Sequence, residues 1–187
     1  TGYYNKTSTM TGSSITVFCK FKSAAFTGGG VEVTLRIFGG ASTSRIHVTL
    51  YSSDYATAAL RNKMQVYTQN SGLTAIVNLF SNIEVCDDKD HFFWFSFSGS
   101  AGTGIFKIDG RDADDVTASG RVAPTIGTLA TGSSVSLYGC YGTGPVLYPY
   151  GGSLGYIGYA EQYLINPDSF YHPTYGLQQI NQITWTQ

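Results

Sequence analysis

Two groups of aspartates are the first residues in this sequence that could do chemistry. Carboxylate oxygens are the hard ligands that calcium prefers, and loop carbonyls could complete a site at the rim of a sheet. Neither group follows the calcium-loop pattern of helix–loop–helix proteins. The sequence favours the alternative, that these aspartates bond to turns and keep strand edges soluble. The calcium candidates are Asp87, Asp88 and Asp90 in the first group and Asp109, Asp112, Asp114 and Asp115 in the second.

Catalytic groups are harder to find. Glycoside hydrolysis needs two carboxyl groups roughly 5 to 10 Å apart across a cleft. Of the glutamates, Glu32, Glu84 and Glu161, only Glu161 in the last long strand is a candidate. No Gly-x-Ser-x-Gly sequence marks a nucleophilic serine, and His47, His91 and His172 are too scattered to suggest zinc. We therefore expect a protein that is not an enzyme.

Aromatic residues suggest a different chemistry, the binding of sugars. A sugar stacks its apolar face on an exposed ring while its hydroxyl groups bond to neighbouring amides and carboxylates. The same aromatic residues could instead pack at the domain edge or in an oligomer contact. The candidates for a glycan or partner site are Tyr148 and Tyr150 in the loop TGPVLYPYGG, and Tyr171, Tyr175 and Trp185 in the tail.

The stretch 91–115, HFFWFSFSGSAGTGIFKIDGRDADD, organises the elements that must position these groups. Alternate residues of HFFWFSF fall on opposite faces of an extended strand, and both faces are apolar. Such a strand belongs in the middle of a sheet that is covered on both sides. The small residues of SGSAGTG then predict a reversal into a second strand, which ends in a tight turn at Asp109 and Gly110.

Alternation of apolar and polar residues predicts the other strands. They are expected at 13–22, 31–37, 44–52, 133–141 and 154–165, with a hairpin of 63–69 and 74–81 and a short edge strand at 2–5. In 13–22 the pattern places Cys19 in the core and Thr16 on the solvent side. Residues 54–62 predict a loop with one helical turn, and Asn166 with Pro167 begins a short helix. The fold class is all-β, a two-sheet antiparallel sandwich of jelly-roll type.

Composition indicates one folded domain over 1–187, with an irregular lead-in at 1–12 and an extended tail at 171–187. Charged residues are only 12% of the chain and aromatic residues 14%, the opposite of a disordered composition. The net charge of −1 argues against nucleic-acid and membrane partners, and no apolar run is long enough to span a membrane. Cys19, Cys86 and Cys140 form no paired framework, and we expect buried free thiols. No signal peptide is recognisable, although an earlier cleavage stays open.

The order of these features resembles the laminin G-like, or concanavalin A-like lectin/glucanase, jelly rolls. The segment DDKDHFFWFSFSGSAGTGIFKIDG is similar to that superfamily's aspartate-rich loop, aromatic strand and strand ending in Asp-Gly. SSITVFCKF is similar to an early strand, and GGSLGYIGYAEQYLINPDSF to the closing strand and short helix. The chain departs from the pattern at Asp90 and His91, where many members have Trp-His. It also lacks the Glu-x-Asp-x-x-Glu sequence typical of the glucanases, which puts catalysis in doubt.

The superfamily contains lectins, adhesion modules, enzymes and virion parts, and the polar tail and low charge resemble bacteriophage head and tail proteins. The resemblance therefore implies a structural or attachment module on a virion surface, bound to other structural proteins or to copies of itself. The alternative is a carbohydrate-binding lectin or adhesion domain, secreted or on a cell surface; a glycoside hydrolase is less favoured. No cofactor is expected to be required, and calcium is possible.

Overall fold

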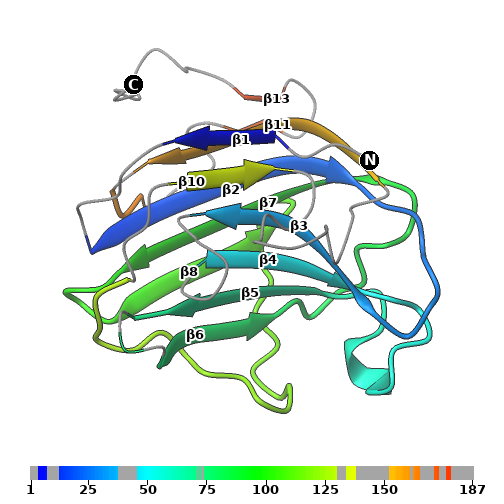
Figure 1. Ribbon diagram of the computed structural model, residues 1–187, viewed down its shortest axis with the longest axis horizontal. Coiled ribbons are helices and arrows are strands. Elements are labelled where there is room, and N and C mark those ends of the chain that lie inside the picture. Colours follow the sequence, from blue (N-terminus) through cyan, green and yellow to red (C-terminus); the bar gives the residue numbers. More distant parts are fainter. Residues whose placement is uncertain are drawn as a thin grey trace.

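The chain folds into two antiparallel sheets packed face to face, as the sequence predicts (Figure 1). The computed structural model describes residues 4–7, 13–37, 46–70, 72, 74–129, 134–137, 152–160, 162–164, 171–172 and 176–177. Within these residues the one helical element is a 3-10 turn, η1 (Ala58–Leu60), in the stretch where the sequence predicts a loop with a helical turn. None of the helical structure described has the length and apolar character needed to span a membrane.

The six-stranded sheet forms one layer of the sandwich. In spatial order its strands are β1 (Tyr4–Thr7), β10 (Ser134–Leu137), β3 (Val31–Ile37), β4 (Ile46–Tyr51), β5 (Met64–Gln69) and β6 (Ala75–Phe80). In β5 the residues Met64, Val66 and Thr68 are buried, and those between them are half-buried. This alternation is the period of a strand that turns one face to a core. Every strand predicted in this sheet overlaps an observed one.

The five-stranded sheet forms the other layer. Its spatial order is β11 (Ser153–Ala160), β2 (Ser14–Lys22), β7 (Asp90–Ser98), β8 (Thr103–Ile108) and β9 (Arg111–Asp112). The aromatic strand β7 lies in the middle, which confirms the prediction made from its two apolar faces. A separate ribbon pairs β12 (Tyr171–His172) with β13 (Gly176–Leu177). The helix start predicted at Asn166 and Pro167 lies outside the described residues.

The main core fills the space between the two sheets. Phe93, Phe95 and Phe97 of β7 contribute rings that are at most 1% exposed, and they pack with aliphatic residues from β4, β5 and β6. Cys19 and Cys86 belong to the same core as free thiols, as predicted, and burial raises the pKa of the Cys19 thiol. Cys140 lies outside the described residues.

The outer face of the five-stranded sheet is covered by a short crossing segment, residues 162–164. It lies over the rings of Phe18, Phe92 and Trp94, against which Leu164 packs. The hydroxyl of Thr16 donates to the carbonyl of Gln162 at 2.7 Å, and the amide of Leu164 donates to the hydroxyl of Ser96 at 2.9 Å. This crossing corrects two predictions. Thr16, expected at the surface, is fully buried, and the last long strand ends at Ala160 because the chain then leaves the sheet.

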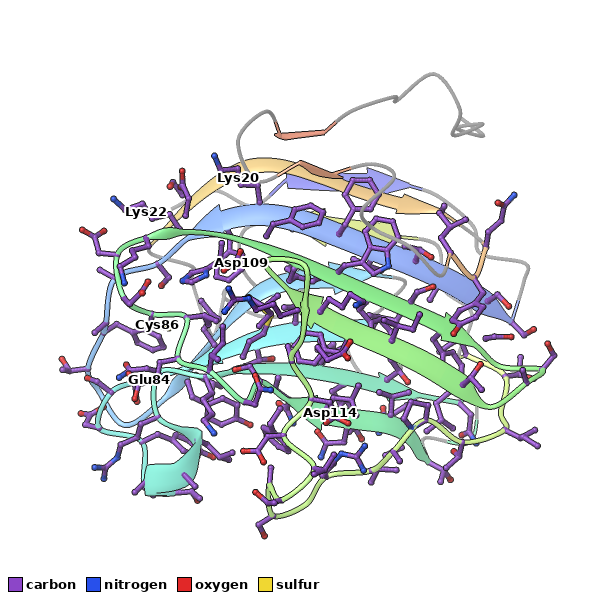
Figure 2. The ribbon with its side chains drawn as sticks, turned by 180° about the vertical axis from the view of Figure 1, so that it is seen from behind. Lys20, Lys22, Glu84, Cys86, Asp109 and Asp114 are labelled. Carbon is purple, nitrogen blue, oxygen red and sulfur yellow. The ribbon has the colours of Figure 1, made fainter. Side chains whose placement is uncertain are left out.

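Residues 113–127 run along the side of the sandwich between β6 of one sheet and β8 of the other, and we call them the closing segment. This segment exchanges two backbone hydrogen bonds between Val122 and Asn78 of β6, and it packs on the β7–β8 hairpin through Pro124. It thereby covers the edge of β6, which would otherwise present unpaired backbone groups to other chains. In Figure 2 the same segment runs below β8 past Asp114.

Strand β3 departs from the regular alternation that its sequence predicts. A bulge between Val33 and Leu35 shifts its register against β4. As a result Val31 packs with Tyr51, Leu60 and Phe80 in an apolar cluster outside the main core. Because a bulge adds one residue on one strand only, it changes which residues face the core on its two sides.

Candidate functional site

The aspartates predicted as calcium ligands are all paired with basic side chains. Asp109 and Asp114 lie well apart in Figure 2, and in the part of the chain that the structure describes no three His, Cys, Asp or Glu residues are grouped to hold a metal ion. Calcium binding therefore stays a prediction to which this geometry adds nothing. The pairs are Asp87 with Lys89 and His91, Asp88 with Lys22, Asp90 with Lys20, Asp109 with His91, Asp112 with Lys107, Asp114 with Arg121, and Asp115 with Lys63.

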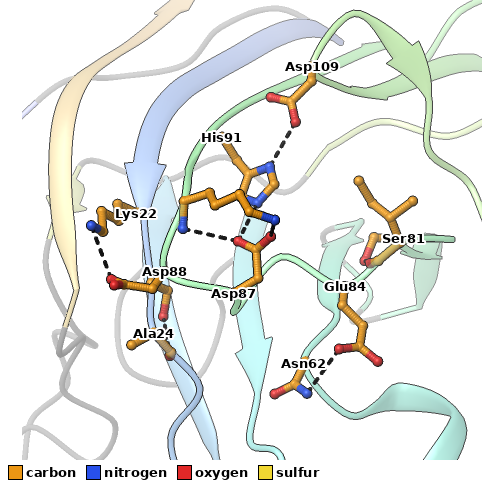
Figure 3. Close-up of polar contacts among 12 residues, drawn as sticks. Lys22, Ala24, Asn62, Ser81, Glu84, Asp87, Asp88, His91 and Asp109 are labelled. Atoms are coloured by element: carbon orange, nitrogen blue, oxygen red, sulfur yellow. Dashed lines mark hydrogen bonds and ion pairs between the residues drawn. The ribbon is translucent and has the colours of Figure 1, made fainter.

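His91 brings Asp87 and Asp109 together (Figure 3). Its Nδ1 lies 2.8 Å from Asp109 Oδ2, and its Nε2 lies 3.0 Å from Asp87 Oδ1. The hydrogen bond that His91 donates to Asp109 raises the pKa of His91; burial opposes this, and the bond to Asp87 adds to it. Burial would raise the pKa of Asp87, but hydrogen bonds from Lys89 and His91 lower it to about 2.

The hydrogen bonds of His91 indicate a structural role rather than a catalytic one. A general base needs one ring nitrogen with a free lone pair facing a substrate. Here both ring nitrogens contact carboxylates, and His91 is only 7% exposed. His91 therefore acts as a buried cationic link between the loop that carries Asp87 and the turn that carries Asp109.

The aromatic residues predicted from the sequence are not brought together by anything described. Tyr148, Tyr150, Tyr175 and Trp185 lie outside the described residues, as does Glu161. Tyr171 pairs through its backbone with Leu177 in the β12–β13 ribbon. The exposed Glu84 accepts a hydrogen bond from Asn62 at 3.2 Å (Figure 3). These candidates therefore stay predictions.

A site that the sequence analysis missed lies on the outer face of the six-stranded sheet. Tyr67 of β5 stands directly beside His47 of β4 and Asn78 of β6 in the register of the strands. The rings of His47 and Tyr67 are 6.2 Å apart. With Gln65 and Gln69, the polar neighbours of Tyr67 on β5, these residues form what we call the Tyr67 face, and all five are half-buried.

Hydrogen bonds orient the amides of the Tyr67 face. Gln65 donates from Nε2 to Asn78 Oδ1 at 2.7 Å and accepts from the hydroxyl of Tyr51 at 3.0 Å. Asn78 in turn donates from Nδ2 to the carbonyl of Gly120 at 2.6 Å. Gln69 donates from Nε2 to the hydroxyl of Tyr67 at 2.7 Å. These hydrogen bonds hold the amide groups in fixed orientations.

An apolar cluster on the same outer face borders the Tyr67 face. Tyr51, Leu60 and Phe80 are its buried members, and Tyr55 packs edge-on against Tyr51 with ring centroids 4.5 Å apart. Burial, reinforced by the neighbouring Tyr55, raises the pKa of Tyr51. Its hydroxyl therefore stays protonated and remains a donor to Gln65.

The sequence contains part of the information that defines the Tyr67 face. The strand MQVYTQ alternates, which places Gln65, Tyr67 and Gln69 on one face. The predicted hairpin of 63–69 and 74–81 pairs this strand with β6. What the sequence does not contain is its pairing with β4 and the register that sets Tyr67 between His47 and Asn78. The site is therefore visible only once the strand order is known.

No protein-family model matches the sequence, and no curated protein matches it either. Solved structures do match in fold. The native heptameric SAP-like pentraxin of Limulus polyphemus matches with a TM-score of 0.57 at 10% identity, over 84% of this chain and 67% of that chain. The CBM40 of the Ruminococcus gnavus IT-sialidase matches with a TM-score of 0.56 at 15% identity, over 82% of this chain and 78% of that chain.

A third match is the binding domain of botulinum neurotoxin serotype G, with a TM-score of 0.54 at 7% identity over 85% of this chain and 35% of that chain. At such identities the matches show the fold alone. The fold is a two-sheet antiparallel β-sandwich of jelly-roll type, which confirms the predicted fold class. None of these three structures is a virion protein, so the predicted virion role gains no support from them.

Proposed function

We propose that this chain is a carbohydrate-binding domain that takes its ligand on the Tyr67 face. The observation that carries the proposal is a half-buried tyrosine flanked on neighbouring strands by side-chain amides and an imidazole. A sugar ring has an apolar face that packs on an aromatic ring and hydroxyl groups that need polar partners around it. The Tyr67 face offers both kinds of contact on one surface.

The hydrogen bonds within the Tyr67 face support this proposal because they leave suitable groups for a ligand. A side-chain amide has two N–H donors and two acceptor lone pairs, and the contacts of Gln65 and Asn78 within the face use one donor and one lone pair of each. The hydroxyl of Tyr67 accepts from Gln69 and keeps its own proton to donate. Since these side chains are already oriented, binding would cost less conformational entropy than it would on a loose surface.

The similar structures support the same class of function. The CBM40 of the Ruminococcus gnavus sialidase, one of the matches in fold, has been solved bound to α2,3 sialyllactose. The bonding of His91 supports a role without catalysis, since the imidazole has no nitrogen left to accept a proton from a substrate.

The test is a glycan array followed by titration of the best ligand. Tyr67→Ala removes the stacking ring and is expected to weaken binding about tenfold or more, about 1.4 kcal/mol or above. Tyr67→Phe keeps the ring and loses only the hydroxyl, so its loss should be smaller. Thr103→Ala, at an exposed position of β8 in the opposite sheet, serves as the matched control and should bind normally.

Two outcomes would contradict the proposal. An array without any hit would count against carbohydrate binding altogether. Binding that survives Tyr67→Ala but is lost in Tyr148→Ala or Tyr150→Ala would move the site to the loop of the original sequence prediction. The virion role, the self-association and the virion or cell-surface location remain predictions; a chain that stays monomeric at high concentration would count against the first two.

A further inference from the structure

We propose that copies of this chain associate by exchanging the crossing segment 162–164, so that the segment of one copy covers the five-stranded sheet of another. The inference is independent of the proposed function, because the crossing segment and the Tyr67 face lie on different sheets. It is carried by a docking site for a short peptide, which side chains of β2 and β7 form on the outer face of the five-stranded sheet.

The docking site is built by two strands inside the five-stranded sheet. In the register of β2 and β7, Thr16 stands opposite Ser96, and Phe18 stands opposite Trp94. These four residues are at most 1% exposed. The two hydroxyl groups therefore lie directly beside an aromatic surface, to which Phe92 adds a third ring. Because β2 and β7 are each paired on both sides, the sheet itself holds these side chains in place.

The docking site binds the crossing segment mainly through the backbone of the segment. Thr16 donates from its hydroxyl to the carbonyl of Gln162 at 2.7 Å, and Trp94 donates from Nε1 to the carbonyl of Leu164 at 3.4 Å. The amide of Leu164 donates to the hydroxyl oxygens of Thr16 at 3.1 Å and Ser96 at 2.9 Å. Leu164 also packs its side chain on the aromatic surface. The site therefore recognises a three-residue backbone with an apolar side chain at its third position.

The crossing segment can leave the docking site without breaking a strand pair. Residues 162–164 belong to no strand, and β11, which precedes them, ends at Ala160 and lies at the edge of the sheet. Gln162 is exposed, and Leu164 is only half-buried. Segments that are held by few contacts open locally at a lower cost in free energy than the core does. The crossing segment should therefore open before the two sheets separate.

The crossing segment of a second copy fits the opened docking site. Opening uncovers the rings against which Leu164 packs, and it removes the backbone groups that bond to the hydroxyls of Thr16 and Ser96. Every opened copy carries both a vacated site and a released segment, so docking between copies restores the same contacts. Since the contacts are the same in both forms, mass action favours the exchanged dimer as the concentration rises.

The test is a complementation experiment that reads the accessibility of Trp94. The reporter chain carries Leu164→Ala, which weakens its own crossing segment, and Trp185→Phe, which leaves Trp94 as its one tryptophan. The supplying chain keeps Leu164 and carries Trp94→Phe and Trp185→Phe, so it contains no tryptophan. Acrylamide should quench the reporter chain more strongly than a chain with Trp185→Phe alone. Adding the supplying chain at high concentration should restore the weaker quenching.

A supplying chain that also carries Leu164→Ala is the matched control and should leave the quenching of the reporter chain unchanged. Strong quenching that persists after the supplying chain with Leu164 is added would overturn exchange between copies. A reporter chain no more accessible than the chain with Trp185→Phe alone would also overturn the proposal, because its segment would not control the site.

The unmodified chain provides a second test, which holds even if the reporter chain does not fold. Isotope-labelled and unlabelled copies are incubated together at high concentration and examined by native mass spectrometry. Exchange of the crossing segment predicts a dimer of mixed mass, which Leu164→Ala should deplete when both copies carry it. A chain that stays monomeric, or a mixed dimer that forms equally well with Leu164→Ala, would overturn the proposal.

Discussion

His91 shows how a single residue ties two loops of this fold together. Asp109, which lies in the turn after β8 at a φ of 53°, contacts Nδ1 of His91 and also accepts a hydrogen bond from the backbone amide of Phe92 at 2.8 Å. Asp87, on the other side of the ring, comes from the loop that leads into β7. Protonated His91 therefore holds the turn and the loop against the same end of the five-stranded sheet.

The pKa values of this cluster define how stability should change with pH. The pKa of His91 is raised above its ordinary value of 6.5, so its contribution is complete below that pH and is lost as the pH rises through the raised pKa. The pKa of Asp87 is lowered from 3.8 to about 2, so its contribution is complete above pH 3.8 and is lost as the pH falls towards 2. The cluster should therefore stabilise the fold most between these limits.

The variant Asp109→Asn tests the upper limit of this pH range, which is set by the pKa of His91. Without the carboxylate the pKa of His91 should move back towards 6.5, and the unfolding free energy should fall less steeply with rising pH. The difference in slope is measured by urea unfolding from about pH 5 to pH 9. Asp112→Asn is the matched control, because it removes a carboxylate that pairs with Lys107 and leaves the contacts of His91 unchanged. Equal slopes for Asp109→Asn and the unmodified chain would contradict the account.

At the scale of elements, the β7–β8 hairpin depends on the closing segment 113–127. The amide of Gly99 donates to the carbonyl of Ser13, and the amide of Gly127 donates to the carbonyl of Gly99 at 3.2 Å. A Cβ atom at position 99 would lie 2.2 Å from the carbonyl oxygen of Gly127 and 2.7 Å from that of Ser13. The sequence indicates a turn at this glycine, but the close approach of two distant backbone segments is what requires it.

Gly99→Ala should consequently destabilise the fold by about 3 kcal/mol or more, since both atoms it would meet belong to the backbone and cannot move aside cheaply. Gly30→Ala is the matched control: its nearest atom would be 3.9 Å away, and its effect should stay within about 0.5 kcal/mol. Urea unfolding of the two variants gives the comparison. A Gly99→Ala chain as stable as the Gly30→Ala chain would show that the hairpin does not pack this closely.

At the scale of the whole molecule, local sequence patterns predict the strands. Contacts between distant segments determine which side chains are buried and which lie side by side on a surface. The two apolar faces of β7 are enough to predict a central strand, and β7 is central. The burial of Thr16 could not be predicted, because Gln162, which covers it, is 146 residues away. The Tyr67 face could not be predicted for the same reason. The residues beside Tyr67 depend on the order of the strands and on their register, which the sequence does not reveal.

The most direct measurement of the central claim is an NMR titration of the isotope-labelled chain with an oligosaccharide that binds on the array. If the ligand occupies the Tyr67 face, the largest shifts should fall on the backbone amides of His47, Tyr67 and Asn78. Amide shifts confined to the five-stranded sheet or to residues 143–152, with these three unchanged, would contradict the account.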